Sequence, residues 1–173
     1  MTLREITDSA GANVAAVSYH FGSLQALCDI AVERALERYL DLQIQGISSL
    51  APDASLHDFA AAFAGPMVRA LAAGGSDLAL MRTVARVGTD PPPGWDRFAA
   101  KFDQSREAAL RPLRANLPGV RKSELVFRTR CAAGMLNWLA LAPIGAELAG
   151  KPRRQIERVL LPVLAGAFRG SGK

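Results

Sequence analysis

The chain has 173 residues, of which half are hydrophobic and only 6% are aromatic. This length suits one ordinary domain, or a small head joined to a larger body. Ala, Leu and Arg are abundant and β-branched residues are sparse, which favours helices over strands. No apolar stretch reaches the roughly 20 residues that span a bilayer, and no export signal is recognisable. We therefore expect an all-α cytoplasmic protein without a membrane segment.

The formal net charge of +5 suggests an acidic partner, but the charge is unevenly distributed. Residues 1–48 contain three basic and six acidic side chains, so the excess of positive charge lies in the remainder. Charge alone does not nominate the N-terminal part as a nucleic-acid binder.

Three helices are predicted in the first part of the chain. Thr2 is a candidate N-cap for a short helix that ends at Gly11. Asn13 caps a second short helix that ends near His20, and a long amphipathic helix follows over 23–48. Two short helices joined by a glycine turn are typical of a helix-turn-helix.

Five further helices are predicted after a loop at 51–53. Ser55 and Asp58 form a capping box at the start of the first, and Pro66 should kink it. Pro112 should bend or end the third helix. The five helices are expected over 55–73, 74–88, 95–117, 123–141 and 152–168, with a proline-rich loop at 91–94.

Each of the last two helices carries two apolar rows, whereas a helix in a small domain needs only one. The extra row predicts either a twofold partner or a helix pair at the centre of the monomer, covered by its neighbours. For the partner, we nominate as the dimer interface Leu125, Thr129, Ala132, Leu136, Ile156, Val159, Leu160, Val163 and Ala167.

Large apolar side chains from several body helices could line a cavity for a hydrophobic ligand. Ordinary core packing is the alternative for the same residues. Arg82 and Arg86 could anchor a carboxylate or phosphate, or could be surface charges. The candidate ligand-binding set is Phe63, Met67, Met81, Arg82, Trp95, Phe98, Phe102 and Trp138.

The chain shows no pattern of catalytic or metal-binding residues. His20 and His57 have no catalytic partner at a recognisable spacing, and no phosphate-cradling glycine loop is present. Cys28 and Cys131 have no metal-ligand spacing and are expected to be buried free thiols. We expect no enzyme activity, no metal and no cofactor.

The string AGANVAAVSYHFGSLQAL, from Ala10 to Leu27, resembles the signature of TetR-type repressors. The resemblance covers the turn, the recognition helix and the start of the connecting helix. It implies that 1–48 form a helix-turn-helix head with the connecting helix, and that 49–173 form a helical ligand-binding and dimerisation body. From Leu78 to Phe168 the spacing is similar to a subgroup that answers to fatty acids or other hydrophobic molecules.

The resemblance also implies which residues meet DNA. Phosphate contacts fall to Thr2, Tyr19 and His20, although Tyr19 and His20 could instead be packing and capping residues. Val14 and Val17 are expected in the core of the head rather than against a thymine methyl. The DNA-binding set is Thr2, Asn13, Ala15, Ala16, Ser18, Tyr19 and His20.

The chain departs from the family pattern in two places and begins late. Leu24 stands where the family has a phosphate-binding lysine, and Ser18 replaces an aromatic residue. Met1 falls where the family head begins its second helix, so we expect an incomplete head and weakened DNA binding. Equal, tight binding of an operator by this chain and by one extended upstream would contradict that expectation.

The resulting hypothesis is a homodimeric DNA-binding repressor that a small hydrophobic ligand releases from its double-stranded operator. The alternative is a dimeric helical module that binds a ligand or a protein and has lost DNA binding.

Overall fold

A computed structural model describes residues 2–91 and 95–170, with the side chain of Arg97 excepted. Every regular element in this part of the chain is a helix, which confirms the all-α prediction. Within the described part, no helix is both long and apolar enough to cross a membrane.

The helices follow the order predicted for the head. They are α1 (Leu3–Ala10), α2 (Val14–Phe21) and the long α3 (Leu24–Ser48). Thr2 caps α1 in a capping box with Glu5, Asn13 caps α2, and Ser23 caps α3. Gly11 adopts the left-handed conformation at the end of α1, with φ of 61°, which glycine enters without strain.

The body consists of α4 (Leu56–Ala73), α5 (Gly75–Thr89), α6 (Ala99–Asn116), α7 (Lys122–Leu141) and α9 (Arg153–Arg169). Two short elements were not predicted: the 3-10 turn η1 (Trp95–Phe98) and α8 (Pro143–Leu148). Pro66 lies inside α4 and Pro112 lies inside α6. Pro112 therefore does not end its helix, which was one of the two outcomes predicted for it. The predicted loop at 91–94 lies largely outside the described residues.

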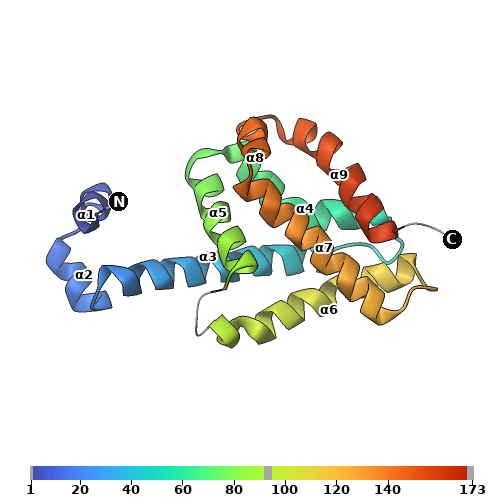
Figure 1. Cartoon of the computed structure of the whole chain (residues 1–173), viewed down its shortest axis with the longest axis horizontal. Coiled ribbons are helices and arrows are strands. Elements are labelled where there is room, and N and C mark those ends of the chain that lie inside the picture. The colour runs from blue at the N-terminus through green and yellow to red at the C-terminus, as the bar shows by residue number, and fades with distance from the viewer. Residues whose placement is uncertain (1, 92–94, 171–173) are drawn as a thin grey trace.

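Helix α3 joins the head to the body. Figure 1 shows α1 and α2 at the far end of α3, away from the body helices. The second half of α3 packs on α4, α5 and α6 and buries Ala35, Leu36, Leu40, Gln43 and Ile47. The connecting helix therefore contributes to the core of the body as well as to the head.

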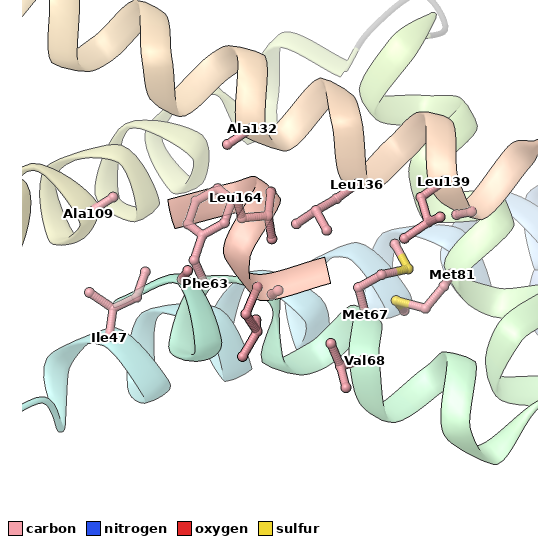
Figure 2. Close-up of a cluster of buried hydrophobic side chains, with 14 of the residues drawn as sticks. Ile47, Phe63, Met67, Val68, Met81, Ala109, Ala132, Leu136, Leu139 and Leu164 are labelled. Atoms are coloured by element: carbon pink, nitrogen blue, oxygen red, sulfur yellow. The ribbon is translucent and has the colours of Figure 1, made fainter. Parts of the chain in front are cut away.

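The main core lies between α4, α5, α7 and α9. Phe59, Phe63 and Phe168 form a cluster of rings whose centroids lie 4.7 to 5.8 Å apart. Met67 and Met81 meet near Leu139 in the same core (Figure 2). Since burial of such side chains supplies most of the folding free energy, this core holds the body together.

The head has a much smaller core than the body. In its two short helices, α1 and α2, only Thr7 and Val17 are buried. Val14 is 41% exposed, so the prediction that it belongs to the core of the head is wrong. The expected core position of Val17 is confirmed, because its side chain is 6% exposed.

Candidate functional site

The body contains a cavity of about 680 Å³, a size typical of small-molecule sites. Residues of α3, α5, α6 and α7 form most of its wall. The apolar part of the wall includes Leu36, Val84, Val87, Phe102 and Trp138. Apolar side chains offer few hydrogen bonds to water, so a cavity of this composition favours an apolar ligand.

The structure separates the predicted ligand-binding residues into two groups. Phe63, Phe102 and Trp138 line the cavity. Met67 is not part of its wall and lies in the main core with 1% exposure. Met81 instead lines a smaller cavity of about 230 Å³.

Three further residues of that prediction also lie away from the large cavity. Trp95 and Phe98 stack on each other with ring centroids 4.8 Å apart, and neither belongs to the cavity wall. The Nε of Arg82 donates a hydrogen bond of 3.1 Å to the backbone oxygen of Ala140, which ties α5 to α7. The prediction that Trp95, Phe98 and Arg82 line the ligand cavity is therefore wrong for this cavity.

Sequence reasoning missed the polar groups of the wall. Gln43 is 4% exposed, and its Nε2 donates to the backbone oxygen of Phe63 at 2.8 Å. The hydroxyl of Ser105 donates to Gln43 Oε1 at 2.9 Å. A signal existed in the sequence, because Gln43 interrupts the buried row of Leu36, Leu40 and Ile47 at helical spacing.

The hydroxyl of Tyr39 lies next to this network. Its oxygen is 3.5 Å from Gln43 Nε2, and Tyr39 packs against the core as a partly buried residue. Burial raises the pKa of Tyr39 to about 12, and the hydrogen bond with Gln43 opposes that rise. The phenol is therefore protonated throughout the neutral range.

The structure corrects the dimer-interface prediction. Leu125, Thr129, Ala132, Leu136 and Ile156 are buried inside a single chain, so a partner cannot reach them. Leu160 and Ala167 are partly buried, whereas Val159 and Val163 are 56% and 53% exposed. Both α7 rows were recognised as apolar, but the nominated row faces the core of the chain.

The other apolar row of α7 is on the surface. Phe127 is 67% exposed and Trp138 is 63% exposed, and Cys131 and Gly134 between them are exposed. Helices α7 and α9 pack on each other, and each carries exposed apolar side chains. We call this the α7/α9 face and define it by Phe127, Cys131, Trp138, Val159 and Val163.

Both cysteines are free thiols, as predicted, but Cys131 is exposed rather than buried and Cys28 is only partly buried. Within the described residues, no group of three or more candidate ligands could hold a metal ion.

Helix α2, predicted to be the recognition helix, presents most of its side chains to solvent. Tyr19 is 85% exposed, and its ring meets the edge of His20 with centroids 5.0 Å apart. Ala15 and Ser18 are exposed, while Ala16 is partly buried.

Two of the predicted DNA contacts also serve as helix caps. Asn13 Oδ1 accepts the backbone N–H of Ala15 at 2.8 Å, and Thr2 Oγ1 accepts that of Glu5 at 3.3 Å. The amide nitrogen of Asn13 and the hydroxyl proton of Thr2 are not used by these caps, so both side chains can still donate to an acceptor.

The raised pKa of Tyr39 predicts a loss of stability at alkaline pH. An unfolded tyrosine loses its proton near the ordinary pKa of about 10, whereas the native phenol holds it to about 12. Unfolding is therefore favoured as pH rises through this window, by up to about 2 kcal/mol, and is unaffected below it.

Urea unfolding of the native chain and of Tyr39→Phe between neutral pH and about pH 11 measures the effect. The stability difference between the two proteins should be constant below about pH 10 and should shift in favour of Tyr39→Phe above it. A difference that does not change with pH would contradict the buried protonated phenol.

Comparison with known families identifies the body. The profile of the family described as "Tetracyclin repressor-like, C-terminal domain" matches residues 61–166, more than half of the chain and most of α4 to α9. No curated protein and no solved structure matches the chain significantly. The match lies outside the helix-turn-helix string, so two separate parts of the sequence agree. The chain belongs to the tetracycline repressor-like (TetR) family.

Proposed function

We propose that this chain is a DNA-binding transcriptional repressor that acts as a homodimer and is released from its operator by a small hydrophobic ligand. The observation that carries this proposal is the course of α3. Its first residues support the recognition helix, and Leu36, Tyr39, Leu40 and Gln43 of its second half line the cavity. A ligand that contacts these residues can therefore change the position of the head through one helix.

The DNA-binding part of the proposal rests on the shape and exposure of the head. Helix α2 follows a glycine turn and lies at the end of the molecule, so it is free to enter a major groove (Figure 1). The exposed phenol of Tyr19 suits a phosphate contact, and Thr2 at the start of α1 suits a second one. Thr2, Asn13, Ala15, Ala16, Ser18, Tyr19 and His20 remain the proposed contacts.

The dimer in this proposal forms through the α7/α9 face rather than through the row first nominated. Five apolar side chains are exposed on these two packed helices, and their burial against a partner would favour association. A twofold axis would place each copy of this face against the other and remove it from water. The two heads of the dimer would then bind two half-sites of a DNA duplex.

A dimeric ligand- or protein-binding module without DNA binding is the second candidate. It is favoured by the acidic excess of residues 1–48 and by Leu24, which offers no positive charge to a phosphate. It shares the cavity and the dimer with the first candidate and differs only at the head.

Substitution of Tyr19 tests the head. We expect Tyr19→Ala to weaken binding to DNA about tenfold, because a hydrogen bond to a charged phosphate is lost. The measurement is a mobility shift at fixed salt with duplexes that the native chain enriches from a random-sequence pool. Gln45→Ala, at an exposed position of α3 within the body, is the control and should bind as the native chain does.

Two outcomes would count against the proposed function. Failure of the native chain to enrich any sequence would favour the module that has lost DNA binding. Equal binding by Tyr19→Ala and the native chain would remove Tyr19 from the interface.

Charge placed on the α7/α9 face tests the dimer. We expect Phe127→Arg and Val163→Arg each to convert a dimer into a monomer, because a buried unpaired guanidinium opposes association. Light scattering at micromolar concentration measures the mass. Leu80→Arg is a matched control, since Leu80 is an apolar residue of α5 with 38% exposure outside this face.

A monomeric native chain would contradict the proposed dimer. A dimer that survives both substitutions would place the interface on another surface.

A further inference from the structure

The polar groups in the cavity are mostly committed to other protein atoms. Gln43 Nε2 donates to Phe63 and Gln43 Oε1 accepts from Ser105. The hydroxyl of Thr129 donates to the backbone oxygen of Leu125 at 2.8 Å, and that of Thr89 donates to Ala85 at 2.8 Å. The bonds of Gln43 tie α3 to α4 and α6, whereas the two threonine bonds lie within α7 and α5. Gln43 Nε2 also donates to the Tyr39 hydroxyl, so none of these groups has a hydroxyl or amide proton left for a guest.

Tyr39 differs from these groups. Its oxygen accepts from Gln43 Nε2, but among the described residues its own proton has no acceptor. Burial holds this proton on the phenol, because the pKa of Tyr39 is raised to about 12. A partly buried hydroxyl without an acceptor is costly unless a ligand or water supplies one. Tyr39 is thus a donor at the wall of an apolar cavity.

The charged groups of the wall are placed differently. Within the described part of the chain, the charged residues of the wall are Arg106 and Arg130, and no carboxylate lines it. Arg106 forms an ion pair with Asp103, and Arg130 is exposed to solvent, where its field is screened. Asn137, a partly buried amide of the wall, is neutral like Tyr39. A charged group placed near Tyr39 and Gln43 would lose its hydration without gaining an ionic partner.

We propose that the cavity binds an uncharged, mainly apolar molecule that carries a ketone, ester or ether oxygen, and that the Tyr39 hydroxyl donates a hydrogen bond to this oxygen. This inference rests on the proposed ligand-binding function and narrows its ligand class. Tyr39 belongs to α3, so the same contact places the ligand oxygen on the helix that carries the head.

The test uses three probes of similar shape: naphthyl methyl ketone, ethylnaphthalene and naphthoate. Calorimetry measures their affinity for the purified chain and for Tyr39→Phe, which removes only the hydroxyl. We expect Tyr39→Phe to weaken the ketone about threefold to tenfold, the value of one neutral hydrogen bond, and to change the hydrocarbon less than about twofold. We expect naphthoate to bind the native chain more weakly than the ketone.

Thr129→Val is the matched control, because it removes a hydroxyl of the cavity wall whose proton is committed within α7. It should leave the preference between the ketone and the hydrocarbon unchanged.

Each outcome decides a different claim. Equal effects of Tyr39→Phe on ketone and hydrocarbon, or tighter binding of naphthoate than of the ketone, would overturn the inference while leaving ligand binding intact. Binding of none of the three probes would overturn the inference together with the ligand-release part of the proposed function. DNA binding is measured separately and does not depend on either result.

Discussion

The structure depends on the continuity of α3, which runs for 25 residues without interruption. Such a helix is roughly 37 Å long, so it reaches from α2 into the core of the body. Its amphipathic face is buried by α4, α5 and α6 over the second half only. Because backbone hydrogen bonds keep a helix stiff, the proposed function requires that a displacement of α3 at the cavity also moves the head.

The cavity and the core use the same helices in different ways. Aromatic side chains of α4 and α9 pack together in the core, whereas residues of α3, α5, α6 and α7 line the cavity. Gln43 and Ser105 bridge α3 and α6 across that space. A buried polar pair with satisfied hydrogen bonds fixes the separation of two helices more specifically than apolar contacts do. The pair thus helps to fix the distance between α3 and α6 at the cavity wall.

Local signals in the sequence predicted most of the fold but less of the site. Caps at Thr2, Asn13 and Ser55 and the glycine turn at Gly11 placed the helix ends, since these depend on neighbouring residues alone. Periodicity identified two apolar rows on α7 but could not tell which one faces the core, because that depends on α5, α6 and α9. The cavity was predicted only in part for the same reason: Met67 and Phe63 lie one turn apart on α4, yet only Phe63 lines it.

The central claim is that α3 couples the cavity to the head, and amide hydrogen exchange tests it most directly. Exchange of α3 peptides is followed by mass spectrometry with and without saturating naphthyl methyl ketone. The account predicts altered protection in residues 24–34, which line no part of the large cavity, as well as in residues 35–48. A change in protection confined to residues 35–48 would show that the ligand affects α3 only near its binding site, and would contradict the coupling.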